Sequence, residues 1–213
     1  LDFNSDFLGL FIDPENLIAQ DCLYQEAPKS EIPLSYHMLP SQEVQLLSSL
    51  LQEKREQPVH VLFYGPAGTG KTSFARALAH SLQDPAYEIL QGDKNKASRR
   101  RAALQACLNM TNNSSGSVLI IDESDHLLNT REQFLFQGEV RDKGWLNSFL
   151  EEPGVRAIWI VNRTASIEES VLRRFAYSKY FPHFSRQKRI QLWKTAVKYN
   201  KAGRFIKEPA IRR

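Results

Sequence analysis

The chain has 213 residues, of which 42% are hydrophobic and 24% charged, with a formal net charge of +4. This composition is ordinary for a globular protein, and no apolar run approaches the roughly 18 residues that a membrane span needs. The two cysteines, Cys22 and Cys107, lie in different segments without metal-ligand spacing, so we expect reduced thiols and a cytoplasmic location.

The N-terminal part carries no readable functional signature. Residues 1–40 are mixed in composition and rich in turn formers. Because the chain begins at Leu1 and shows no signal-peptide pattern, we expect it to be part of a longer protein. From Ser41 onward, apolar residues at helical spacing predict a helix that packs on a sheet.

A glycine-rich loop between a strand and a helix is the most informative motif. Residues 59–64 are apolar and β-prone, and apolar residues from Phe74 recur at helical spacing until Asp84. The stretch between them fits G-x-x-x-x-G-K-[ST], in which backbone N–H groups and the positive end of the helix surround an anion. We therefore predict a phosphate-binding loop made of Gly65, Pro66, Ala67, Gly68, Thr69, Gly70, Lys71, Thr72 and Ser73.

Two side chains of this loop are expected to contact a nucleotide. Lys71 can reach the β- and γ-phosphates, and the Thr72 hydroxyl can ligate Mg²⁺. The alternative is a chance glycine turn, which the flanking strand and helix disfavour.

A strand, a polar loop and a helix follow, at residues 87–90, 91–96 and 97–110. Apolar residues surround Cys107 at helical spacing, so this thiol is predicted to lie in the core. Three consecutive basic residues near the start of this helix oppose the helix dipole. Their charge could serve another purpose, but we expect solvent exposure for all three: Arg99, Arg100 and Arg101.

Two acids come directly after Ser117 and the four apolar residues 118–121. The carboxyl ends of parallel strands are where ligands of open α/β sheets bind. We expect Asp122 to organise Mg²⁺ and Glu123 to polarise an attacking water as general base. The alternative is a pair of solvated acids after a buried strand.

A further strand at residues 155–161 ends at Asn162, whose amide can bond both the γ-phosphate and the attacking water. Residues 167–175 predict a short helix that contains Arg173 and Arg174. Arginine commonly stabilises charge on a transferring phosphoryl group, often from a neighbouring protein. Helix-dipole partners or surface salt bridges are the alternatives for both residues.

Taken in order, GPAGTGKT, LIIDES, the strand-ending Asn162 and SVLRRF resemble the AAA+ ATPases, close to the AAA branch, over roughly residues 40–185. The resemblance implies Walker A and Walker B motifs, a sensor 1 residue at Asn162, and an arginine finger donated to the next subunit of a ring. Arg174 is the better finger candidate and Arg173 the other. Family members often carry a second arginine three residues after Arg174, where this chain has Tyr177.

The implied fold is a three-layer α/β P-loop NTPase with a parallel five-stranded sheet and the start of a small α-helical lid. Strands are expected near residues 59–64, 87–90, 117–122, 155–161 and 177–181. We divide the chain into an N-terminal segment (1–40), the AAA+ core (41–184) and the truncated lid (185–213), in which no sensor 2 arginine can be placed.

Charge is distributed unevenly along the chain. Residues 173–213 hold thirteen Lys or Arg and one acid, for a local +12, whereas residues 1–172 hold fifteen basic and twenty-three acidic residues, for −8. Such a region can attract nucleic acid or an acidic partner. The simpler interpretation, which we favour, is a basic lid that complements the charge of the nucleotide.

The expected function is Mg²⁺-dependent ATP hydrolysis that drives conformational work on a macromolecule, with protein remodelling or unfolding favoured and a hexameric ring by resemblance. One alternative is a nucleic-acid-associated ATPase of the initiator or loader type, although the Ser-Arg-Cys finger of clamp loaders is absent. Another is an ATP-binding scaffold with little hydrolysis. The cluster Phe134-Leu135-Phe136 can line a ring pore or, as we favour, pack or contact another subunit.

Overall fold

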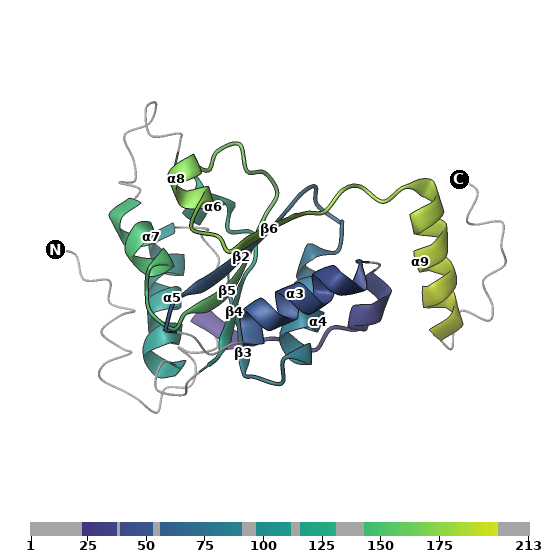
Figure 1. Cartoon of the computed structure of the whole chain (residues 1–213), viewed down its shortest axis with the longest axis horizontal. Helices are drawn as coiled ribbons and strands as arrows, with labels where there is room; N and C mark the ends of the chain where they lie inside the picture. Colours follow the sequence, from purple (N-terminus) through teal and green to yellow (C-terminus); the bar gives the residue numbers. More distant parts are fainter. Residues whose placement is uncertain are drawn as a thin grey trace.

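The computed structural model describes residues 23–37, 39–52, 56–90, 97–111, 116–130 and 143–199. Within these ranges a six-stranded sheet forms the centre of the molecule (Figure 1). Its spatial order is β1-β3-β4-β5-β2-β6, with β1 antiparallel to β3 and the other neighbours parallel. The strands are β1 (Tyr24–Glu26), β2 (Val59–Tyr64), β3 (Ala86–Ile89), β4 (Val118–Ile121), β5 (Arg156–Val161) and β6 (Tyr177–Tyr180).

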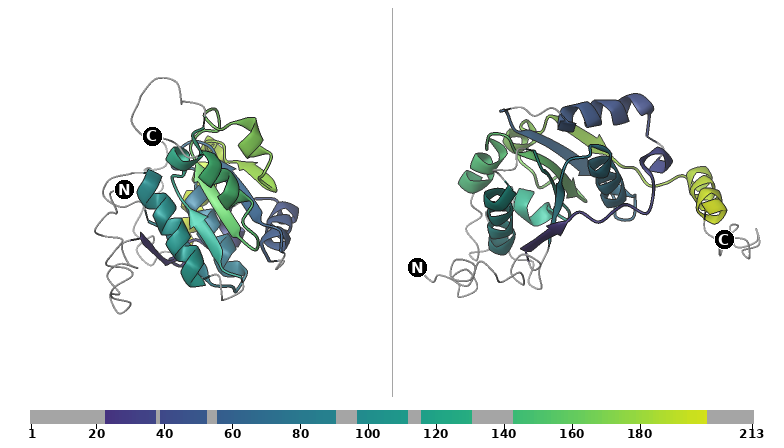
Figure 2. Two further views of the ribbon diagram at one scale, coloured as in Figure 1. Left: turned by 90° about the vertical axis from the view of Figure 1, so that its left-hand side faces the viewer. Right: turned by 90° about the horizontal axis from the view of Figure 1, so that it is seen from below.

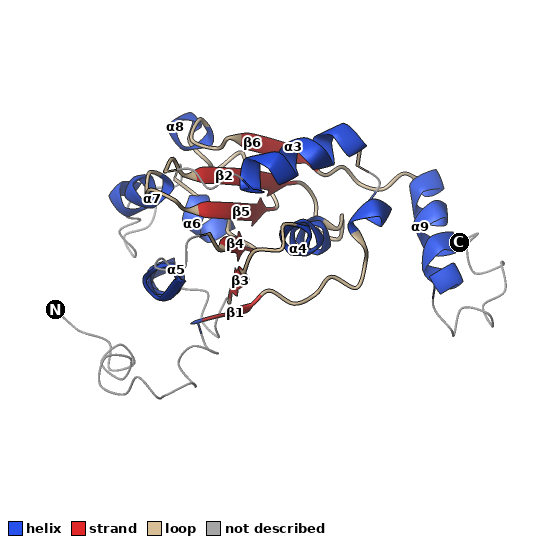
Figure 3. Cartoon of the chain, turned by 60° about the horizontal axis from the view of Figure 1, so that its bottom comes forward, coloured by secondary structure: helices blue, strands red, loops and turns tan. Residues whose placement is uncertain are grey.

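Helices cover both faces of the sheet, as the view in Figure 3 shows. On one face lie α3 (Ser41–Gln52) and α4 (Lys71–Ser81). The other face carries α5 (Ala97–Thr111), α6 (Asp125–Leu128), α7 (Lys143–Leu150) and α8 (Glu169–Leu172). The 3₁₀-helix η1 (Leu34–His37) contacts α4, and α9 (Arg186–Tyr199) stands apart from these layers beyond β6 (Figure 2).

Two hydrophobic clusters, one on each face, explain why β2, β4 and β5 are mainly apolar. Successive side chains of a strand point to opposite faces. In β5, Trp159 therefore packs with Phe149 of α7, whereas Ile160 belongs to the cluster on the other face, which includes Leu78 of α4. Every residue of β2, β4 and β5 except Tyr64 is buried, as expected for parallel strands covered on both faces.

The register brings three strand ends together. Tyr64 pairs with Val161, and Ile121 pairs with Trp159. The residues that follow β2, β4 and β5 thus leave the sheet at the same edge, with β5 between the other two. The glycine loop, the acid pair and Asn162 therefore all lie at this edge of the sheet.

The predicted α/β fold is confirmed, and all five predicted parallel strands are present with small shifts in their ends. The sheet has one strand more than predicted, because β1 pairs with β3 from within residues 1–40. Three residues are too short for a periodic pattern, so β1 depends on its partner strand. The predicted helix at 167–175 is shorter, as α8, whereas the burial of Cys107 is confirmed.

One expectation is wrong: Arg100 is only 1% exposed instead of lying in solvent. The division of the chain into three segments stays a prediction, and the Phe134–Phe136 cluster lies outside the described residues. In the part of the chain that is described, no helix combines the length and the apolar character needed to cross a membrane.

Candidate functional site

The phosphate-loop residues leave β2 through a backbone that requires glycine. Gly65 has φ 139°, and a Cβ added there would lie 2.2 Å from the backbone oxygen of Phe181. Gly68 and Gly70 also have positive φ, at 74° and 85°. Gly70 directly precedes α4, so the unpaired N–H groups of the first helical turn face the loop. This backbone can surround an anion as the sequence predicts.

Hydrogen bonds tie the loop to itself and to its surroundings. The Thr69 hydroxyl donates to the Pro66 oxygen at 2.8 Å, and Ser73 shares a 3.2 Å hydrogen bond with Ser30. Ala67 and Gly68 at the tip are exposed. The tip therefore remains open to a ligand while its flanks are fixed.

Lys71 is buried, and its ammonium group connects β2 with β5. Nζ donates to the oxygens of Gly65 (2.6 Å) and Pro66 (2.8 Å) and to Oδ1 of Asn162 (3.4 Å). These three contacts use all three N–H donors of the side chain. Burial lowers the pKa of Lys71, while the charges of Asp122 and Asp125 act in the opposite direction.

Asp122 connects the start of α4 with the end of β4. Its Oδ2 accepts the Thr72 hydroxyl at 2.7 Å, and its Oδ1 accepts the backbone N–H of Glu123 at 2.8 Å. Hydroxyl and carboxylate oxygens are the hard ligands that Mg²⁺ prefers. Among the described residues, no three His, Cys, Asp or Glu side chains are arranged to hold a metal ion by themselves. Mg²⁺ would be held by these two oxygens together with phosphate and water. The donor set fits that ion.

Glu123 has a backbone conformation that is unusual for a residue other than glycine. Its φ is 46°, in the left-handed region, which costs of order 1–3 kcal/mol and persists only where neighbouring groups enforce it. The residue is exposed, so water can reach its carboxylate. The next residue, Ser124, is buried and bonds the Ile160 oxygen through both its N–H and its hydroxyl.

Asp125 and Arg100 are not among the predicted site residues, yet both contact the site. The Asp125 carboxylate accepts the backbone N–H of Asn162 at 3.0 and 3.3 Å, which connects α6 with the end of β5. Arg100 donates to the oxygens of Asp122 and Glu123. A third acid in the run D-E-S-D is a signal for Asp125, whereas local sequence gives none for Arg100.

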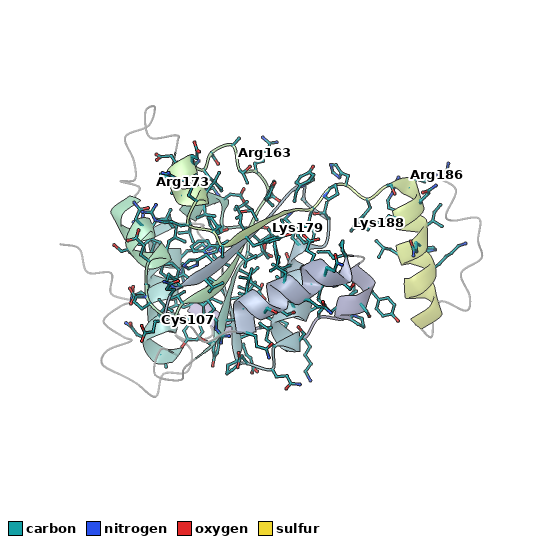
Figure 4. All side chains as sticks on the ribbon, viewed as in Figure 1. Cys107, Arg163, Arg173, Lys179, Arg186 and Lys188 are labelled. Atoms are coloured by element: carbon teal, nitrogen blue, oxygen red, sulfur yellow. The ribbon has the colours of Figure 1, made fainter. Side chains whose placement is uncertain are left out.

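The two arginines predicted as finger candidates, Arg173 and Arg174, do not contact the described residues of the phosphate site within this chain. Arg174 donates to Oε1 of Glu151 at 2.8 and 3.0 Å and to the Ser170 oxygen at 2.6 Å. Arg173 is exposed beside α8, and Figure 4 shows it near the surface. In the described residues neither arginine has a hydrogen bond to Lys71, Thr72, Asp122 or Asn162.

Fold and site together define a P-loop nucleotide-binding α/β protein. Residues 61–183 match the model of the family described as "ATPase family associated with various cellular activities (AAA)", and the chain belongs to this family.

Known proteins agree with that assignment. Fidgetin-like protein 1 of Drosophila melanogaster is 31% identical over 173 residues, which cover 72% of this chain and 31% of that protein. A crystal structure of the FIGL-1 AAA domain aligns with a TM-score of 0.63 and 21% identity, covering 86% of this chain and 66% of that chain.

A structure from an E. coli HORMA:CdnC:Trip13 complex aligns with a TM-score of 0.61 and 16% identity, covering 90% of this chain and 79% of that chain. At these identities the structures establish the fold alone. The chain spans only part of the length of the curated relatives it matches, between 27% and 40% for three of them.

Proposed function

We propose that this chain binds ATP with Mg²⁺ and hydrolyses it to drive conformational work on a macromolecular partner, with a protein favoured. One observation carries the proposal. The contacts from Lys71 to Asn162 and from Thr72 to Asp122 join the ends of β2, β4 and β5 around the glycine loop. A cation, a hydroxyl, a carboxylate and an amide are the groups that a bound nucleoside triphosphate requires.

In this proposal Lys71 exchanges its carbonyl contacts for phosphate oxygens. Because the buried ammonium is already held at the loop, little side-chain entropy is lost on binding. Asn162 lies within reach of the same ammonium and would contact the terminal phosphate and a water. Glu123, exposed at the adjacent strand end, would accept the proton of that water. Mg²⁺, when bound by Thr72 and Asp122, would supply positive charge to the phosphate oxygens.

The roles of the arginines rest on assembly into a ring, for which family membership is the support. Within one chain Arg174 is bound to Glu151, so it would act on a neighbouring subunit only after giving up that ion pair. Arg173 is exposed and has no ion pair with any of the described residues. Arg174→Ala keeps an intact nucleotide site, and Glu123→Gln keeps the arginine, so each variant should be inactive alone while a mixture of the two should recover ATPase activity if Arg174 acts on the next subunit. A mixture as inactive as either variant alone would exclude action in trans.

The direct test is the Mg²⁺-dependent ATPase rate of the wild type and of Glu123→Gln. We expect the variant to bind ATP with unchanged affinity and to lose about 10²- to 10⁴-fold in kcat, because the water then lacks its base. Glu152→Gln, at an exposed position after α7, should hydrolyse ATP like the wild type. Equal rates for wild type and Glu123→Gln would refute the assignment, and ATP binding without turnover in the wild type would favour a scaffold.

A nucleic-acid partner is the second candidate, supported by the basic C-terminal region. In α9 the exposed residues include Arg186, Arg189 and Lys194, and Figure 4 shows Arg186 and Lys188 on this helix apart from the sheet. Stimulation of the ATPase rate by DNA, with a steep loss on adding salt, would support this candidate. Stimulation by an unfolded polypeptide alone would support protein remodelling.

A further inference from the structure

Arg100 is a buried charge at the site that the proposed mechanism leaves unused. It belongs to the first turns of α5 and is 1% exposed, whereas its neighbour Arg99 is exposed. Arg101, the next residue, is half-buried and lies over the Trp145 ring at 5.8 Å. Three arginines in a row thus have three environments, and only one of them points into the protein.

Among the described residues, the guanidinium of Arg100 donates to backbone carbonyls and to no carboxylate. One terminal nitrogen donates to the Glu123 oxygen at 2.7 Å, and the other donates to the Asp122 oxygen. Burial lowers the pKa of Arg100, and the charges of Asp122, Glu123 and Asp125 act against that effect. Removing a charge from water is costly, so these hydrogen bonds and nearby charges must compensate for its burial.

The two carbonyls that Arg100 binds lie on either side of the strained position. The Asp122 carbonyl belongs to the peptide that enters Glu123, and the Glu123 carbonyl to the peptide that leaves it. Fixing both peptides fixes the rotations between them, including the φ of 46°. Asp122 Oδ1 holds the N–H of the same turn, and Ser124 anchors the following residue on Ile160. The other contacts join residues of β4, β5 and the turn itself, whereas Arg100 reaches the turn from the helix α5.

We propose that Arg100 is a positioning residue: it holds the Asp122–Glu123 turn in its left-handed form and thereby aims the Glu123 carboxylate at the attacking water. This role rests on the proposed hydrolytic function of Glu123. Arg100 contacts neither Lys71 nor Thr72, so its loss should affect turnover and leave nucleotide binding intact. A shift of about 1 Å in a reacting group can cost about a hundredfold in rate.

Kinetics of Arg100→Gln and Arg100→Lys, with Arg99→Gln as a control one position away, test this role. We expect kcat of Arg100→Gln to fall at least about tenfold while KM and the affinity for ATP stay within about twofold. Arg100→Lys, which keeps a charged donor, should recover part of kcat, and Arg99→Gln should match the wild type. Wild-type kcat in Arg100→Gln, or equal losses of kcat and ATP affinity, would overturn the proposal.

A double variant separates positioning from a general structural role. If Arg100 acts through Glu123, then adding Arg100→Gln to Glu123→Gln should lower the residual rate no further. An additional loss equal to that of the single variant would mean that Arg100 acts independently of Glu123, contrary to the proposal.

Amide hydrogen exchange provides a readout that does not depend on hydrolysis. In Arg100→Gln the amides of residues 123–125 should exchange faster than in the wild type, with exchange in α4 unchanged. Unchanged exchange at residues 123–125 would overturn the positioning role. If the wild type hydrolyses no ATP, the proposed function fails, and the exchange experiment still decides whether Arg100 holds the turn.

Discussion

The two ends of the parallel sheet each bury a cation, but they use it differently. At the carboxyl ends, buried Lys71 lies beside exposed Asn162, so its ammonium is held next to a surface that a ligand can reach. At the amino ends, Arg156 is 3% exposed and donates to the Leu51 oxygen and to Asp84, at 2.9 Å for the carboxylate. We infer that burial of a charge serves the site at one end and the fold at the other.

Removing the amino-end cation should have the largest effect on stability. Arg156→Met leaves Asp84 and the Leu51 oxygen without their donor, so we expect the free energy of unfolding to fall by about 3 kcal/mol. Asn162 is six residues further along the chain, about 20 Å at 3.3 Å per residue, so ATP affinity should stay within about twofold. Urea unfolding and nucleotide titration measure the two effects, with Arg189→Met on exposed α9 as control. If Arg156→Met lost ATP affinity without losing stability, Arg156 would serve the site and not the fold, contrary to the comparison between the two ends.

His60, in the amino-terminal half of β2, should make stability depend on pH. Burial lowers its pKa from 6.5 to about 4, and its Nδ1 accepts the Trp159 indole N–H at 3.1 Å. Because the folded state disfavours the charged ring, the unfolded chain takes up the proton first. The stabilisation is complete above pH 6.5 and is lost as the pH falls toward 4, by about 3 kcal/mol in total.

The comparison with His60→Gln isolates this effect from the titration of carboxylates. Between pH 7 and pH 4, the wild type should lose about 3 kcal/mol of unfolding free energy more than the variant. A difference between the two proteins that stays constant with pH would show that His60 does not titrate as the burial predicts.

At the carboxyl end of the sheet, substitution by Ala should cost different amounts of unfolding free energy at two glycines of the phosphate loop. Gly65→Ala would place Cβ 2.2 Å from the Phe181 oxygen at a φ of 139°, so we expect a loss of about 2–3 kcal/mol in unfolding free energy. Gly68→Ala has nothing within 4 Å of the new Cβ and should cost only about 1 kcal/mol, from its φ of 74°. Thermal unfolding compares them, and equal losses would mean that the approach of Phe181 does not constrain the loop.

Sequence predicts well which side chains lie together where each of them follows directly after a strand. The glycine loop, the acid pair and Asn162 each come immediately after an apolar run, and parallel pairing brings such positions to one edge. Lys71, Thr72, Asp122 and Asn162 are therefore found together as their order in the chain suggests. Their chemical roles stay predictions until a ligand is bound.

Other features depend on contacts between distant segments, which local patterns do not reveal. Arg100 is buried because α5 brings it against the turn that follows β4, and a run of three arginines indicates only a solvated helix face. Asp125 matters because β5 ends beside it. The strand β1 exists because β3 offers an unpaired edge, and its three residues carry no pattern of their own.

The central claim is that a triphosphate binds where β2, β4 and β5 end. A crystal structure of the chain grown with Mg²⁺ and a non-hydrolysable ATP analogue tests it most directly. We predict phosphates on the backbone N–H groups of residues 67–72, Lys71 on the phosphate oxygens, and Mg²⁺ bound by Thr72 and Asp122. A nucleotide seated elsewhere, with the hydrogen bonds from Lys71 to Gly65 and Pro66 unchanged, would contradict the claim.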